Sequence, residues 1–256
     1  MTKSRDVSDL ICRSGEAIDI SIPLRFNGPQ PNAYGVGRAA SEPVRAGSLT
    51  GDTRQGGSVN FEQYTFIPHC NGTHTECVGH ITDERISVRD CLRDVMVPAL
   101  LVTVEPERDG NDLVISKTSI ELSIEERDVR GSALIVRTLP NDDQKLMAEY
   151  DQNAVPPYFT TEAMEYIVER GFSHLLADLP SIDRLFDDGK LSNHRIFWSV
   201  KAGSRIVEED TRIHSTITEL IYVHDRVGDG EYLLNIQIAP FESDCAPSRP
   251  ILISGT

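Results

Sequence analysis

Residues 69–80 form the segment that most restricts the fold of this chain. They read HCNGTHTECVGH and hold three of the chain's seven histidines, together with one carboxylate and two thiols. Imidazole, carboxylate and thiolate groups are the side chains that bind zinc and similar divalent ions. No second Cys/His pair follows in the sequence at the spacing of a zinc finger or ribbon. We therefore expect a larger fold that presents these groups at an open, catalytic type of metal site.

The spacing within this segment indicates which side chains share a face. His74 and Glu76 are two residues apart, so an extended segment places both on one face, which His80 would share. Cys70 has the same parity as His74, but Gly72 lies between them and is expected to interrupt the regular strand. The pattern favours a metal site over separate structural or surface histidines.

The overall charge excludes some classes of partner. The 256 residues include 25 Lys and Arg against 40 Asp and Glu, a formal net charge of −15. Nucleic acids and anionic membrane surfaces select basic patches, so neither is expected as a partner. No apolar run approaches the roughly 20 residues of a membrane span, and the N-terminus lacks the apolar core of a signal peptide. We expect a single domain over residues 1–256.

The cysteines indicate a reducing compartment. There are five of them: Cys12, Cys70, Cys77, Cys91 and Cys245. An odd, scattered set in a chain of this length is unlike a secreted disulfide framework, which predicts a cytoplasmic protein. Most of these side chains are expected to be small buried hydrophobes. Cys70 and Cys77 differ because they lie within the histidine-rich segment.

Alternation and short apolar runs predict more strand than helix. Helices are expected at residues 87–96 and 160–170, the second with Thr160 or Thr161 as N-cap and Gly171 at its end. Strands are expected at residues 17–22, 62–68, 99–104, 133–136, 175–177, 216–223 and 232–239. These elements do not alternate regularly, so the class is α/β without a doubly wound sheet or a (β/α)8 barrel.

Residues 27–58 differ in composition from the rest of the chain. The stretch holds seven glycines, three prolines and one aromatic residue, Tyr34. Connections of this length inside a domain are usually functional or disordered. We expect an active-site loop that forms a lid or a substrate wall, with Phe26 and Tyr34 as substrate-binding groups. A plain surface loop is the alternative.

The histidine-rich segment resembles a family signature, H-x-G-T-H-x-D-x-P-x-H. This signature is typical of the Putative cyclase family of metal-dependent hydrolases, which includes bacterial kynurenine formamidases and isatin hydrolases. Four residues match it: Gly72, Thr73, His74 and His80. Later segments resemble the family in the same order: Leu176–Asp183, Leu191–His194, Ile217–Leu220, Gly230–Phe241 and Asp244–Arg249. The resemblance extends from about residue 18 to the C-terminus.

Three positions depart from the signature. Its first histidine falls on Cys70, while His69 comes one residue early. Either Cys70 serves as a thiolate ligand or a local bulge brings His69 inward, and the register with His74 favours Cys70. The aspartate of the signature is Glu76, which is one methylene longer, and its proline is Val78. A longer carboxylate can still coordinate if the ion or the backbone shifts.

The resemblance implies a set of metal ligands: Cys70 (or His69), His74 and Glu76 for one ion, and Glu76, His194 and Glu219 for a second. His80 would act as the general acid and base, since its unperturbed pKa lies near 6.5. One or two divalent ions per chain are implied. A thiolate ligand favours Zn2+ over Mn2+, because soft ligands disfavour manganese.

The function implied by the resemblance is hydrolysis of a C–N amide bond, in an aryl formamide or a cyclic amide, by a metal-activated water. Two alternatives remain: a metal-dependent lyase or cyclase acting on a small carbonyl compound, and a non-catalytic metal-binding homologue. The implied fold is a mixed β-sheet that curls toward a barrel with peripheral helices, a swivelling β/β/α, cyclase-like architecture. The implied partners are a small-molecule substrate and a second copy of the chain, in a homodimer or higher homo-oligomer.

Overall fold

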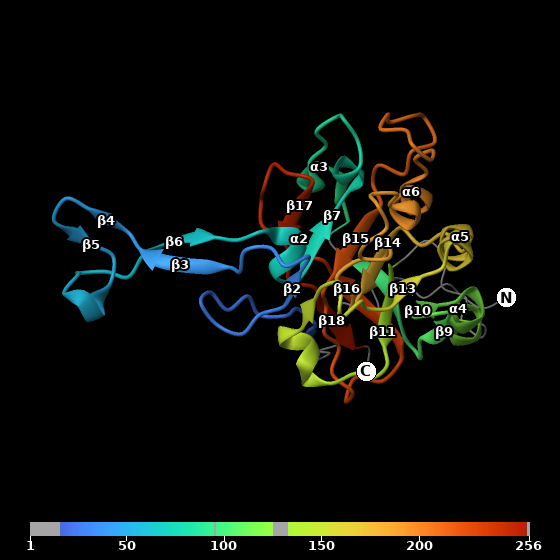
Figure 1. Cartoon of the computed structure of the whole chain (residues 1–256), viewed down its shortest axis with the longest axis horizontal. Coiled ribbons are helices and arrows are strands. Elements are labelled where there is room, and N and C mark those ends of the chain that lie inside the picture. The colour runs from blue at the N-terminus through green and yellow to red at the C-terminus, as the bar shows by residue number, and fades with distance from the viewer. Residues whose placement is uncertain (1–15, 95, 125–132, 255–256) are drawn as a thin grey trace.

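A nine-stranded mixed sheet forms the centre of the protein (Figure 1). The structure is a computed structural model, and it describes residues 16–94, 96–124 and 133–254. Cys12 lies outside these residues. In spatial order the strands are β1 (Ala17–Asp19), β18 (Ile251–Ser254), β16 (Gly230–Asn235), β8 (Val97–Val104), β11 (Ala133–Thr138), β14 (His174–Ala177), β15 (Thr216–Glu219), β7 (His74–Glu76) and β17 (Cys245–Pro247).

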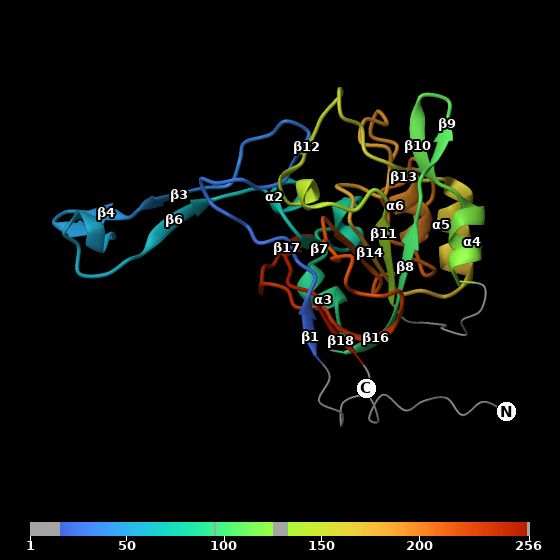
Figure 2. The ribbon, with the colours of Figure 1, turned by 90° about the horizontal axis from the view of Figure 1, so that it is seen from below.

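The four central strands, β8, β11, β14 and β15, run parallel, and the flanking strands pair antiparallel. The central strands are mostly apolar and buried on both faces, which is why they appear in the sequence as continuous apolar runs. One face packs against α4 (Lys117–Ile124), α5 (Thr161–Glu169) and α6 (Ser192–Trp198), which lie together beside the sheet in Figure 2. The expected α/β fold with a curled mixed sheet and few helices is confirmed.

The helix expected at residues 160–170 is confirmed as α5. The Thr160 side chain accepts a hydrogen bond from the backbone N–H of Ala163 and caps the helix. Gly171 follows with φ of 81°, a left-handed conformation that ends the helix. The helix expected at residues 87–96 was wrong in length, because α3 (Val88–Cys91) is a single turn that Ser87 caps.

Residues 38–66 form an arm that projects away from the sheet (Figures 1 and 2). The arm consists of two antiparallel ribbons: β3 (Ala40–Pro43) with β6 (Glu62–Thr65), and β4 (Arg45–Ala46) with β5 (Leu49–Thr50), followed by η1 (Thr53–Gln55). The strand expected at residues 62–68 is therefore present but ends at Thr65. Residues 27–58, which were expected to form one loop, instead hold the short strands β2 (Asn32–Ala33) to β5 and η1, which alternate with irregular segments.

Shorter elements connect these parts. They are β2 (Asn32–Ala33), β9 (Glu107–Asp109), β10 (Asp112–Ile115), η3 (Asp143–Met147), β12 (Glu149–Tyr150) and β13 (Tyr158–Phe159). In the described part of the chain, no helix has the length and apolar character that crossing a membrane requires. The four cysteines that the structure describes are buried free thiols.

Candidate metal centre

Most of the expected ligands meet near one end of the strand order, where β15 and β7 pair. Glu219 lies opposite His74 in this antiparallel pair, and directly opposed residues project from the same face. The short helix α6 brings His194 to the same place, with its Nε2 2.9 Å from Glu76 Oε1. Segments far apart in the sequence thus converge on one buried cluster of imidazoles and carboxylates.

His74 is fully buried and faces Glu219. Its Nδ1 lies 2.9 Å from the carbonyl oxygen of Gly72, which fixes the ring, and its Nε2 lies 3.3 Å from Glu219 Oε2. Among the described residues, this Nε2 has no hydrogen-bond partner of good geometry. Burial alone would lower the pKa of His74. The Glu219 carboxylate raises this pKa by more, so the net shift is upward. A buried nitrogen without a partner, aimed at a carboxylate, is the arrangement expected of a metal ligand.

Glu76 is the central carboxylate of the cluster. Its Oε2 lies 3.6 Å from His69 Nε2 and 3.9 Å from His80 Nδ1, while its Oε1 contacts His194. Burial alone would raise the pKa of Glu76, but the surrounding imidazoles lower it well below its usual range. Both oxygens of this longer carboxylate therefore face ligand nitrogens, which suits a bridging group.

Asp183 holds His194 from behind. Its Oδ2 lies 2.6 Å from His194 Nδ1, and its two oxygens also accept the backbone N–H groups of Asn193 and His194. Burial lowers the pKa of His194, but the carboxylates of Asp183 and Glu76 raise it well above its ordinary value. A carboxylate on Nδ1 fixes the tautomer that leaves Nε2 for coordination. Asp183 ends the segment Leu176–Asp183 that resembles the family, whereas the sequence did not predict α6.

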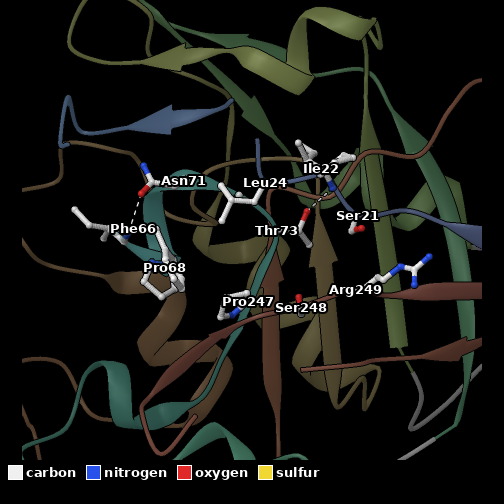
Figure 3. A pocket seen from close by; sticks show the side chains of 13 residues that line it. Ser21, Ile22, Leu24, Phe66, Pro68, Asn71, Thr73, Pro247, Ser248 and Arg249 are labelled. Atoms are coloured by element: carbon white, nitrogen blue, oxygen red, sulfur yellow. Dashed lines mark hydrogen bonds between the residues drawn. The ribbon is translucent and has the colours of Figure 1, made fainter. Parts of the chain in front are cut away.

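The structure brings His69 into the cluster, and Cys70 packs elsewhere. A helical turn, α2 (Pro68–Asn71), replaces the expected end of the strand, and the Asn71 side chain accepts a hydrogen bond from the backbone N–H of Ile67 (Figure 3). This turn is the local bulge that swings His69 inward.

Cys70 packs instead against Ala33 and Leu185. Burial, with Glu219 adding to it, raises the pKa of the Cys70 thiol to about 11. Cys70 belongs to none of the ligand groups found among the described residues, so the geometry favours His69 over Cys70.

Thr73 fixes the entry to β7 from the other side. Its Oγ1 accepts a hydrogen bond of 2.7 Å from the backbone N–H of Ile22 (Figure 3) and donates to the carbonyl of Leu220. A small pocket lies here, with Leu24 and Pro247 in its wall. Thr73 thus ties β7 to the loop after β1 and to the residue that follows Glu219.

His80 reaches the cluster by a route that the sequence did not suggest. The expected extended segment from His74 to His80 was wrong, because η2 (Val78–His80), a 3-10 turn, follows directly after Cys77. The turn buries Val78 in the core and folds His80 back, so its Nδ1 lies 3.3 Å from Asp244 Oδ2. Burial alone would lower the pKa of His80. Glu76 and Asp244 together raise this pKa by more, so the net shift is upward.

The two aromatic residues expected at the substrate site lie in different places. Tyr34, with φ of 61°, packs its ring edge-on against Phe186. Burial raises the pKa of the Tyr34 hydroxyl, and Glu219 adds to this effect. Phe26 packs against Tyr64 at the base of the arm, with ring centroids 4.5 Å apart.

Two residues of the site escaped the sequence reasoning. Asp244 Oδ2 lies 3.0 Å from His69 Nε2, and the next residue, Cys245, stands opposite Glu76 in the β7–β17 pair. Burial raises the pKa of the Cys245 thiol well above its ordinary value. The segment Asp244–Arg249 resembles the family, but the sequence assigned Asp244 no role at the metal, since its position depends on how β17 pairs.

The donor set fits a divalent cation. No ion is part of this structure, but three groups of side chains present ligand atoms within 4.8 Å of one another: His69, His80 and Asp244; Glu76, His80 and His194; and His74, Glu76 and Glu219. Ligands bound to tetrahedral zinc at roughly 2.0 to 2.1 Å lie about 3.3 Å apart. The nitrogen–oxygen separations among the ligand atoms of the cluster, between 2.9 and 3.9 Å, bracket this value. Imidazole and carboxylate suit zinc, and carboxylate also suits manganese.

Comparisons with known proteins give consistent findings. A family model described as "Putative cyclase" matches residues 18–184. A kynurenine formamidase of Bacillus cereus is 27% identical over 247 residues, which covers 94% of this chain and 98% of the relative. The solved structure of a potential metal-dependent hydrolase with cyclase activity has a TM-score of 0.61 at 16% identity, covering 93% of this chain and 98% of that one. An isatin hydrolase bound to the product analogue thioisatinate has a TM-score of 0.65 at 14% identity, covering 97% and 96%.

Proposed function

The chain belongs to the Putative cyclase family, and from this membership we propose that it is a metal-dependent hydrolase of C–N amide bonds. The substrate class is an aryl formamide or a cyclic amide, in line with the kynurenine formamidases that match it over 94% of its length. One observation carries the proposal above others. The buried His74 Nε2 has no hydrogen-bond partner among the described residues and faces Glu219 within a cluster of imidazoles and carboxylates.

We assign five side chains to the ion or ions: His69, His74, Glu76, His194 and Glu219. Glu76 would be the residue shared between two ions, because its two oxygens face different imidazoles. Zn2+ is the first candidate and Mn2+ the second. A divalent ion in this place supplies Lewis-acid polarisation of a carbonyl and lowers the pKa of water.

His80 is the residue that moves the proton in this proposal. Its Nδ1 faces the carboxylate of Asp244, which leaves Nε2 available to the substrate side. A neutral Nε2 accepts a proton from the attacking water and, once protonated, donates it to the leaving nitrogen. Glu76 and Asp244 stabilise the imidazolium that exists between these two transfers.

Residues near the cluster supply the substrate wall. Tyr34, the aromatic residue within residues 27–58, packs edge-on against Phe186, and burial and the charge of Glu219 raise the pKa of its hydroxyl, so we assign it to substrate contact. Phe26 lies with Tyr64 and Phe66 at the base of the arm, where an aryl group of the substrate would meet it. The whole chain is one catalytic unit in this proposal.

We further assign the protein to the cytoplasm and to a homodimer. Four buried free thiols suit a reducing compartment. The arm exposes apolar side chains, among them Val59 and Phe61, and an isolated two-stranded ribbon is marginally stable in water. A second copy of the chain would cover these side chains.

Metal analysis combined with labelled water tests the proposed function. Protein purified without chelator or added metal is analysed by elemental mass spectrometry and then incubated with N-formylaniline or a lactam in water enriched in oxygen-18. We expect one or two ions per chain and one labelled oxygen in the carboxylate product. An unlabelled elimination product would overturn the hydrolase assignment, as would a folded protein that takes up neither zinc nor manganese.

A further inference from the structure

Asp244 occupies a fixed position beside the metal centre. It directly precedes β17, whose first residue, Cys245, pairs with Glu76 of β7. The strand pairing therefore anchors the backbone of Asp244 next to the central carboxylate of the cluster. Its side chain is partly exposed, at 30%, so it lies on the solvent side of this cluster.

A single oxygen of Asp244 contacts two imidazoles. Oδ2 lies 3.0 Å from His69 Nε2 and 3.3 Å from His80 Nδ1, and these three atoms lie within 4.8 Å of one another. Glu76 Oε2 faces the same two nitrogens, at 3.6 and 3.9 Å. Glu76 Oε2 and Asp244 Oδ2 thus face the same His69 nitrogen, and their separations from it, 3.6 and 3.0 Å, lie close to the about 3.3 Å between ligands of tetrahedral zinc.

We propose that Asp244 is a metal ligand of this chain, binding the ion that His69 and Glu76 face. The inference rests on the proposed function, which supplies the ion. A carboxylate oxygen has two lone pairs, so Oδ2 can bind the ion and also accept the Nδ1–H of His80. The second contact fixes the His80 tautomer that leaves Nε2 free for proton transfer.

The extra carboxylate accounts for the shifted first histidine. His69 comes from the α2 turn, one residue before the position that the family signature gives to its first histidine, where this chain has Cys70. The turn places the His69 ring beside that of His74 and directs its Nε2 toward Asp244. Asp244 supplies an oxygen donor where the Cys70 side chain packs away into an apolar cluster.

Metal affinity measured without substrate tests the inference. The full-length protein is stripped with chelator, and zinc is titrated in competition with a chromophoric chelator for wild type, Asp244→Ala, Asp244→Asn and Glu242→Gln. Glu242 is the matched control, since it lies on the same loop and its side chain is 81% exposed. We expect the zinc affinity to fall at least about tenfold in Asp244→Ala, and to stay at the wild-type value in Glu242→Gln.

Each outcome separates this inference from the proposed function. Zinc binding by Asp244→Ala with wild-type affinity and stoichiometry overturns the inference and leaves the proposed function intact. A wild-type protein that binds no divalent ion overturns both. Cobalt-loaded Asp244→Asn gives a second readout: we expect a changed visible absorption spectrum, and an unchanged spectrum counts against a ligand role. This isosteric variant decides the question if Asp244→Ala fails to fold by circular dichroism.

Discussion

The metal-centre end of the sheet and the arm are built on opposite principles. At the metal centre, side chains from β7, α6 and β15 are buried and face partners at defined distances. In the arm, local turns hold two-stranded ribbons, as at Gly47 and Gly56 with φ of 60° and 85°, and apolar side chains face solvent. The contrast teaches that long-range strand register determines the chemistry, while the arm depends on contacts near in sequence. Substitutions should therefore have very different consequences in the two regions.

The largest effect is expected at the centre of the cluster. Glu76→Gln keeps the shape of the side chain but removes the charge that faces His69, His80 and His194. We expect the hydrolysis rate to fall by more than about 100-fold, because even supporting residues of metal sites cost roughly 10- to 100-fold. Steady-state kinetics and elemental analysis measure this loss. Retained ions together with retained activity would show that Glu76 does not hold the metal.

The next largest effect is expected at Asp183, which contacts the proposed ligand His194. Asp183→Asn keeps the position but removes the charge that holds His194 Nδ1 at 2.6 Å. We expect zinc affinity to fall by about 10- to 100-fold, since the carboxylate no longer fixes the ring and its tautomer. Isothermal titration calorimetry on stripped protein measures the change. An affinity equal to that of wild type would show that α6 alone positions His194.

His174 is a buried histidine outside the cluster. It shows what burial alone, without the metal centre, does to the pH dependence of stability. His174 is buried between Thr216 and Asp94, and burial lowers its pKa below the ordinary value of about 6.5. The folded state then binds fewer protons than the unfolded state, so stability is present above pH of about 6.5 and is lost as the pH falls toward the folded-state pKa.

We expect this acid-side loss to be smaller in His174→Gln than in wild type, on metal-free protein compared by urea unfolding at pH 7.5 and 5.5. The difference between the two pH values isolates His174, because the cluster histidines are the same in both proteins. An equal loss in both proteins would show that His174 has no part in it.

The smallest effect on stability is expected in the arm. Val59 and Phe61 are 49% and 41% exposed, so the double substitution Val59→Ser, Phe61→Ser removes little packing within the chain. We expect the free energy of unfolding per chain to change by no more than about 0.5 kcal/mol. Sedimentation should show the variant shifting from two chains toward one. A large destabilisation of a protein that is monomeric from the start would mean that the arm packs on its own body.

The sequence predicted the elements of the fold better than the position of each ligand. The apolar runs at residues 99–104 and 133–136 became β8 and β11, because strands buried on both faces leave a continuous apolar pattern. The preference for Cys70 over His69 rested on strand parity, which the α2 turn removes. Asp244 begins a segment that resembles the family, but only the pairing of β17 with β7 brings it to the site.

The pairing of β7 with β15 also sets when the protein can acquire its metal during biosynthesis. A ribosome delivers residues 69–80 long before it delivers His194, Glu219 or Asp244. During that interval the emerging segment offers three imidazoles and two thiols without its later partners, and such a segment can chelate zinc in a non-native arrangement. Correct loading is therefore a post-translational event, and protein made in a zinc-rich medium should yield more misloaded chains than protein that is folded first and given metal afterwards.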